Sequence, residues 1–178
     1  FCWNFYLTNN HIKHETKDLP YCTIRYQDWK NYCLKGLENL SIKEFNVQSI
    51  TNLKKYYEIK LDNGEEIFAK KIYDSRTPNL ENENVKQHFF GYLIETKQMI
   101  NSNSVTLMDF RVEQKMGLHF MYCLPIDENR MLVESTVFSS EIQEDDWYQK
   151  QILEYIETKL NLSEYKIVDE EKGALPMY

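Results

Sequence analysis

The chain has 178 residues, of which 42% are hydrophobic and 28% charged, a composition typical of folded globular proteins. Its formal net charge of -7 argues against a nucleic-acid partner, because phosphate binding needs a basic surface, and it gives no electrostatic attraction to an anionic membrane. No apolar run approaches the roughly 18 residues of a transmembrane helix, and the first residues lack a signal-peptide pattern. Both ends look cut, so we expect the chain to be an internal part of a longer protein.

The first half of the chain predicts one helix and one hairpin. Asp28 can cap a helix with apolar residues on one side. These apolar residues are Trp29, Cys33, Leu37 and Leu40. Around Asn63-Gly64, alternating residues on both sides of a tight turn predict a β-hairpin over 56–74. The polar stretch 76–84, which contains Pro78, reads as a linker, and we place a domain boundary there.

The second half predicts an antiparallel sheet with one helix against it. Four segments have strand character and short polar connections: 87–96, 104–114, 118–125 and 130–138. The last two are expected to pair as a hairpin. A helix follows, with acids at 144–146 suited to its first turn and an apolar stripe. The stripe consists of Tyr148, Ile152, Ile156 and Leu160, and a last strand is expected over 165–168. The predicted fold class is α+β.

No metal site is predicted. The four cysteines, at positions 2, 22, 33 and 123, form no CxxC pair, and reduced cysteines are expected. His11 and His14 have the spacing of one helical face, but no third ligand accompanies them.

Five short motifs follow one another along the second half of the chain. They are Gln87-His88-Phe89-Phe90-Gly91, the Met-Asp to Val-Glu-Gln run over 107–114, the aromatic strand 120–125 ending in Leu-Pro, the Arg-x-Leu-Val-Glu-x-Thr strand 130–136, and Glu-x-Gly-x-Leu-Pro-Met over 171–177. In this order they resemble motifs of bacterial, flavin-dependent lycopene cyclases. Residues 21–76 resemble the end of the family's flavin-binding domain more loosely, with Asp74-Ser75-Arg76 after its closing strand.

The resemblance implies part of a Rossmann-type FAD/NAD(P)-binding flavoprotein. Residues 1–84 would be the end of its FAD-binding domain, and 85–178 a truncated substrate-binding β-sheet domain. It implies reduced FAD as cofactor, NAD(P)H as reductant, and Asp74 and Arg76 as cofactor contacts. Because the family's glycine-rich loop is absent and the five glycines are isolated, we expect this chain alone to hold no flavin.

The family's reaction, cyclisation of the linear carotenoid lycopene to a β-ring product, places clear demands on side chains. A carboxylic acid must protonate a terminal alkene, and burial keeps such an acid neutral until it is used. Glu134 stands in the motif that is Phe-Leu-Glu-Glu-Thr in plant members, whose first Glu is thought to be this acid. Asp109 and Glu113 are second candidates, and an ion pair with Arg111 is their structural alternative.

Aromatic faces stabilise the carbocation that follows protonation. The aromatic candidates for substrate contact are Phe89, Phe120, Tyr122 and Phe138, for which ordinary core packing is the alternative. Since the carotenoid substrate is a membrane lipid, the resemblance implies a cytoplasmic protein that touches the membrane peripherally.

Two other classes of protein stay open. Another flavoprotein of the same fold, such as a hydroxylase or a polyprenyl reductase, would share the hairpin and Asp74 but has no reason to carry the 132–136 motif. A non-catalytic carotenoid or lipid binder would need an apolar sheet face but no acid, so substitution of Glu134 separates it from an enzyme.

Overall fold

The computed structural model describes residues 1–76, 80 and 84–177, which form two compact units. The first, here called the sheet unit, combines Phe1–Thr23 with the chain after Arg76. The second, here called the inserted unit, consists of Ile24–Arg76 and interrupts the sheet unit in sequence.

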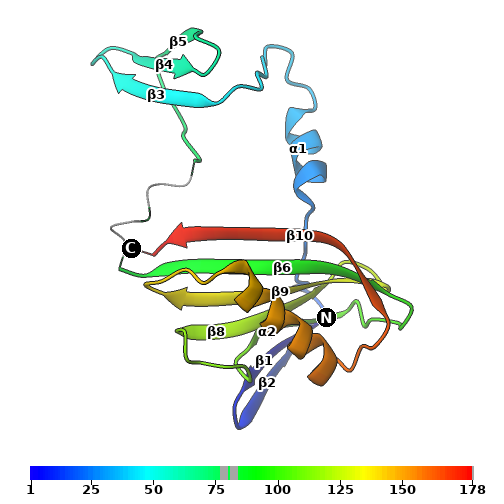
Figure 1. Cartoon of the computed structure of the whole chain (residues 1–178). Helices are drawn as coiled ribbons and strands as arrows, with labels where there is room; N and C mark the ends of the chain where they lie inside the picture. The colour runs from blue at the N-terminus through cyan, green and yellow to red at the C-terminus, as the bar shows by residue number, and fades with distance from the viewer. Residues whose placement is uncertain (77–79, 81–83, 178) are drawn as a thin grey trace. The chain divides into compact units, whose positions relative to one another are not determined.

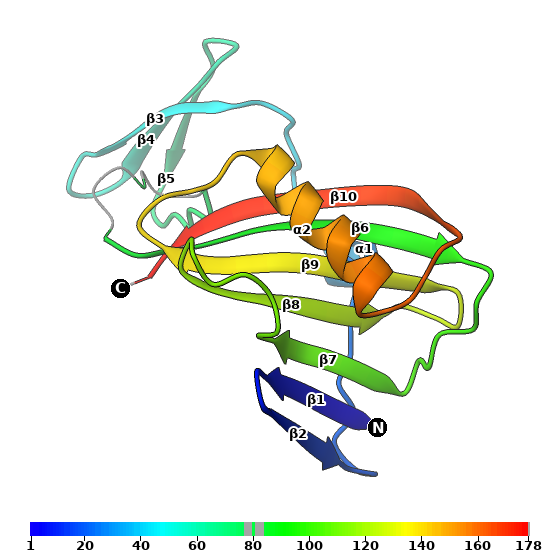
Figure 2. The ribbon, with the colours of Figure 1, turned by 60° about the horizontal axis from the view of Figure 1, so that its bottom comes forward.

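Within the described residues, the sheet unit is built on a seven-stranded sheet with the order β10-β6-β9-β8-β7-β1-β2 (Figure 2). The strands are β1 (Cys2–Leu7), β2 (Asn10–Glu15), β6 (Lys86–Thr96), β7 (Ser104–Asp109), β8 (Leu118–Pro125), β9 (Arg130–Ser139) and β10 (Tyr165–Pro176). Neighbouring strands are antiparallel except β1 and β7, which are parallel. The predicted hairpin of β8 and β9 is confirmed, with Tyr122 opposite Glu134.

One helix, α2 (Asp145–Thr158), lies across one face of this sheet and packs on β6 and β9 (Figures 1 and 2). Asp145 and Asp146 occupy its first turn, as the sequence predicts. The predicted stripe is buried through Ile156 and also includes Tyr155, whereas Leu160 lies beyond the helix end but still packs against the core. Burial of each large apolar side chain in this layer contributes roughly 1.5–3 kcal/mol to folding.

The inserted unit is small. It contains α1 (Tyr26–Leu34), β3 (Val47–Asn52), β4 (Tyr57–Leu61) and β5 (Glu66–Ala69), with the three strands in the order β3-β4-β5. The predicted hairpin is confirmed in β4 and β5, with Gly64 at φ +83° in the turn, but pairing stops at Ala69 rather than continuing to residue 74. The helix prediction is wrong at both ends. It begins after Arg25 and ends before Gly36, which has φ +82°, so Leu37 and Leu40 lie outside it.

The division of the chain differs from the predicted boundary. Residues before Ile24 belong to the sheet unit, because β1 pairs with β7 across about a hundred residues, with Cys2 opposite Ser104. Local sequence patterns do not report such a distant pairing. Of the predicted linker 76–84, residues 77–79 and 81–83, Pro78 among them, lie outside the described residues.

Two predicted strands have other lengths than expected. The strand predicted over 104–114 ends at Asp109, and just beyond it the backbone N–H and the guanidinium of Arg111 donate hydrogen bonds back to the Asp109 carboxylate. The strand predicted over 165–168 continues to Pro176 as an edge strand along β6.

Candidate active site

Glu134 lies on the face of the sheet opposite α2. Its chain neighbours Val133 and Ser135 are fully buried, and Val133 belongs to the core beneath the helix. Side chains alternate along a strand, so Glu134 projects from the other side. We call this surface, formed by alternate residues of β6, β8, β9 and β10, the Glu134 face.

The strand registers arrange the Glu134 face in rows. The central row runs Tyr122, Glu134, Gly91, Glu171 across β8, β9, β6 and β10. The adjoining rows are mostly apolar and consist of Phe120, Thr136, Phe89 and Gly173 on one side, and Leu124, Leu132, Leu93 and Asp169 on the other. The carboxyl group of Glu134 therefore stands between two largely apolar rows.

This environment favours the protonated form of Glu134. Its pKa is raised to about 7, chiefly by burial and in smaller part by the neighbouring carboxyl group of Glu171. The Thr136 hydroxyl opposes this shift in part, since it donates a hydrogen bond to Glu134 Oε1 at 2.5 Å. At neutral pH a substantial fraction of Glu134 therefore carries a proton and can donate it.

An aromatic cluster lies beside the acid. Phe120 is only 1% exposed, and its ring centroid is 5.2 Å from that of Tyr122 and 6.0 Å from that of Phe138. Phe110, just past the end of β7, joins the cluster at 5.4 Å from Phe120. Phe89 covers Gly173, where an added Cβ would lie 2.8 Å from the Phe89 ring. The structure thus brings all four predicted aromatic residues to the Glu134 face.

The sequence reasoning did not single out Phe110 or Glu171 as site residues. Both lie within the motifs that carry the family resemblance, and that position could have marked them as candidates. Their relation to Glu134 depends on which strands pair, and no local pattern gives that.

Asp109 lies on the opposite face, beneath α2. Its side chain is fully buried, pairs with Arg111 at 2.6 Å and accepts a hydrogen bond from the Tyr155 hydroxyl at 2.6 Å. Burial raises the pKa of this carboxyl group, but the hydrogen bonds from Arg111 and Tyr155 outweigh it and leave the pKa lowered. Asp109 therefore connects α2 to the end of β7 and does not meet Glu134.

Glu113 is also separate from Glu134. Its carboxylate pairs with Lys115 at 2.7 Å. The sequence had offered Arg111 as its partner. Its backbone carbonyl accepts a hydrogen bond from Nδ1 of the buried His119 at 2.8 Å. Because a carbonyl only accepts, His119 carries its proton on Nδ1, and Nε2 is left to accept from Ser135 Oγ at 2.9 Å.

The two predicted cofactor residues lie after β5 in the inserted unit. Arg76 donates to both carboxylate oxygens of Asp74, at 2.9 and 2.7 Å, and to the carbonyl of Val47 at 3.1 Å. These bonds from Arg76 hold the pKa of Asp74 down at about 2. An ionised carboxylate beside a guanidinium fits the hydroxyls and phosphates of a dinucleotide, and the carboxylate keeps further lone pairs to accept from them. The residues present fit a contact to FAD but form no glycine-rich cradle in the described chain.

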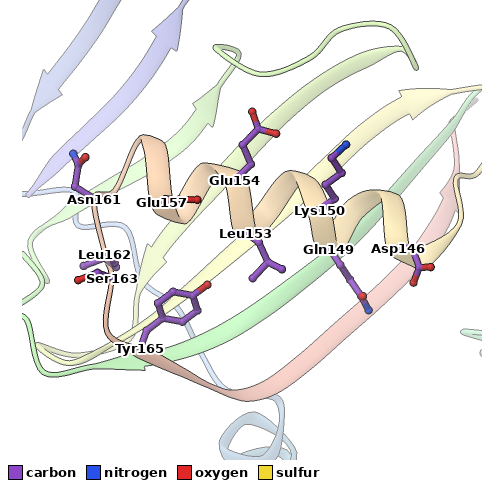
Figure 3. Close-up of a pocket in the computed structure, with 10 residues that line it drawn as sticks. All are labelled: Asp146, Gln149, Lys150, Leu153, Glu154, Glu157, Asn161, Leu162, Ser163 and Tyr165. Carbon is purple, nitrogen blue, oxygen red and sulfur yellow. The ribbon is translucent and has the colours of Figure 1, made fainter.

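A separate surface hollow lies along the outer side of α2 (Figure 3). Leu153 of the helix and Tyr165 at the start of β10 point into it, amid charged and amide side chains. It lies on the helix side of the sheet and includes none of the predicted site residues.

In the part of the chain that the structure describes, no group of three or more His, Cys, Asp or Glu residues is placed to hold a metal ion. Neither helix described here has the length and apolar character needed to cross a membrane.

The fold is shared with part of a solved halogenase. Solved structures of halogenase PltM match it with a TM-score of 0.65 at 11% identity, over 100% of this chain and 42% of that chain. A PltM variant in complex with FAD gives 0.68 at 10% identity, over 99% and 42%. At this identity the likeness shows the fold alone.

The family is shown by sequence. The family model described as "Lycopene cyclase protein" matches residues 3–178, and the chain belongs to this family. A lycopene beta-cyclase of Pseudescherichia vulneris is 30% identical over 122 residues, which cover 67% of this chain and 31% of that protein. The chain thus spans about a third of this relative.

Proposed function

We propose that the protein to which this chain belongs is a flavin-dependent lycopene cyclase in which Glu134 is the acid that starts ring closure. The observation that carries the proposal is the setting of Glu134, a carboxyl group with a pKa of about 7 between apolar rows and beside an aromatic cluster. Membership of the lycopene cyclase family supports the choice of substrate, a linear carotenoid with terminal alkenes.

Each group of the Glu134 face has a task in this proposal. An alkene is a weak base, so the donor must hold its proton at neutral pH yet lie close to the alkene carbon. The O–H bond of Glu134 breaks as a C–H bond forms, and Thr136 orients the carboxyl group through its hydrogen bond. The rings of Phe120, Tyr122 and Phe138 then present their faces to the cation, and they contain no strong nucleophile that would trap it.

The cofactor in this proposal is reduced FAD, with NAD(P)H as reductant, in a Rossmann-type domain. When bound, reduced flavin supplies negative charge density and acid-base chemistry near the cation. From this chain, Asp74 and Arg76 would contact its ribose or phosphate groups. Because the substrate is a membrane lipid, we further propose a cytoplasmic protein with peripheral membrane contact.

The test is Glu134→Gln in the full-length protein. Gln keeps the size and can still accept from Thr136 but cannot protonate carbon, so we expect the cyclisation rate to fall by roughly 10² to 10⁴. Lycopene is supplied to the enzyme under reducing conditions and the products are separated by chromatography. Glu154→Gln, an exposed substitution on α2, is the matched control and should keep the parent rate.

Two results would contradict the proposal. A Glu134→Gln enzyme that forms cyclic carotenoid near the parent rate would remove Glu134 from the mechanism. A parent protein that binds lycopene without converting it, with binding unchanged in the variant, would indicate the non-catalytic carotenoid binder.

A further inference from the structure

Glu134 has a carboxyl neighbour that its motif does not contain. In the central row of the Glu134 face, Gly91 of β6 stands between Glu134 on β9 and Glu171 on β10. Those two strands flank β6 on either side, so the two glutamates would ordinarily be separated by the side chain of the strand between them.

Glycine at position 91 removes that separation. A Cβ built on Gly91 would lie 3.1 Å from Cδ1 of Leu132, 3.3 Å from Cγ of Glu171 and 3.4 Å from Cβ of Glu134. The space that any other residue would fill is therefore occupied by Leu132 and by the two acidic side chains, one from each side. The two acidic side chains therefore approach one another over the glycine, and the negative charge of Glu171 acts on the carboxyl group of Glu134.

No cation compensates this pair in the contacts that the described residues make. The adjacent Lys172 points to the other face and pairs with Asp145 of α2 at 2.6 Å. On β9, Arg130 pairs with Asp127 at 2.6 Å. The other titratable groups in the central row and the two rows beside it, Tyr122 opposite Glu134 and Asp169 two residues from Glu171, are acids as well. The cations Arg130 and Lys166 stand with Glu95 one row further along the strands. Two carboxylates at such a distance repel, and a single shared proton removes the repulsion.

We propose that Glu171 is a positioning residue for Glu134, and that the two carboxyl groups hold one proton between them across Gly91. The pair is asymmetric, because Glu171 lies exposed on the edge strand whereas Glu134 is largely buried between apolar rows. Water solvates the charge on Glu171, and the shared proton stays on Glu134, where the acid is needed. This inference rests on the proposed role of Glu134 as acid.

The experiment titrates Glu134 directly in the full-length protein. The carbonyl stretch of protonated Glu134 is the infrared band that Glu134→Gln removes, and its loss is followed as pH rises. In Glu171→Gln the negative neighbour is gone, so we expect the midpoint to fall by about one pH unit, a tenfold loss of proton affinity. Glu170→Gln changes the net charge equally on the next residue and should leave the midpoint in place.

The outcomes separate this inference from the proposed function. If the titration midpoint of Glu134 is unchanged in Glu171→Gln, or is lowered equally by Glu170→Gln, the proposal that Glu134 and Glu171 share a proton is wrong. If the protein is an active cyclase, the alkaline limb of its pH profile should move down with the midpoint in Glu171→Gln. If it proves inactive on lycopene, the infrared titration still decides whether the pair exists. Equal melting temperatures of parent and Glu171→Gln exclude a folding defect.

Discussion

The pKa of Glu134 carries a consequence for stability that can be measured without substrate or cofactor. In the unfolded chain a glutamate has its ordinary pKa of 4.5, and in the folded protein burial raises that of Glu134 to about 7. The folded state therefore binds this proton more tightly than the unfolded state. The contribution of this proton to the free energy of unfolding is fully present below pH 4.5 and is lost as pH rises through about 7.

The magnitude follows from the same two values. A tenfold difference in proton affinity corresponds to about 1.4 kcal/mol, so the step from 4.5 to about 7 has an upper limit of about 3 kcal/mol. Because Glu134 is only partly removed from water and part of the pKa shift comes from Glu171, we expect the free energy of unfolding to change by about 1 to 2 kcal/mol. Replacement by Gln removes the ionisation and should stabilise the protein by this amount at pH 8, with little change at pH 4.

The assay is urea denaturation of parent and Glu134→Gln at pH 4 and at pH 8, with unfolding followed by circular dichroism. The quantity of interest is the change with pH in the difference between their free energies of unfolding, so that other titrating groups cancel. Glu154→Gln should show almost no such change. If Glu134→Gln is equally stabilising at both pH values, or is less stable than the parent at pH 8, the reasoning about its burial is refuted.

Two further substitutions test the scaffold. Asp109→Asn leaves the Arg111 guanidinium without its anion, and since that side chain is 36% exposed we expect a loss of about 2 to 3 kcal/mol in urea denaturation; a loss under about 1 kcal/mol would contradict a structural role. Gly117→Ala places a Cβ 2.4 Å from the carbonyl oxygen of Phe138 at φ +135°, and should cost about 2 kcal/mol or more by thermal unfolding; a melting temperature equal to the parent's would show that the turn relaxes freely.

The sequence predicts the centre of the sheet well and its edges poorly, for a physical reason. β8 and β9 are joined by a short connection and are rich in apolar residues, so their extent and pairing follow from local pattern. β10 has one strand neighbour, and its charged Asp169–Lys172 run carries no alternation, so its full length was missed. β1 and β2 were missed because β1 depends on a partner far along the chain.

The candidate site shows the same limit. Motif resemblance pointed to Glu134 and to aromatic residues that the structure places on the same face. It also pointed to Asp109, whose burial beneath α2 depends on the Tyr155 hydroxyl, a contact between segments that sequence patterns do not connect. Glu171 becomes visible only once the registers of β9, β6 and β10 are known together.

The parallel pairing of β1 with β7 also affects how the chain acquires its structure. Asn4 donates hydrogen bonds to Ser104 Oγ and to the Val105 carbonyl, both at 2.9 Å, about a hundred residues further along. At a synthesis rate of about 5 to 20 residues per second, the first strand waits roughly 5 to 20 s for this partner. During that time the β1–β2 hairpin has no third strand, and isolated hairpins are marginal in water. Docking of this hairpin on β7 is thus a non-local step in folding.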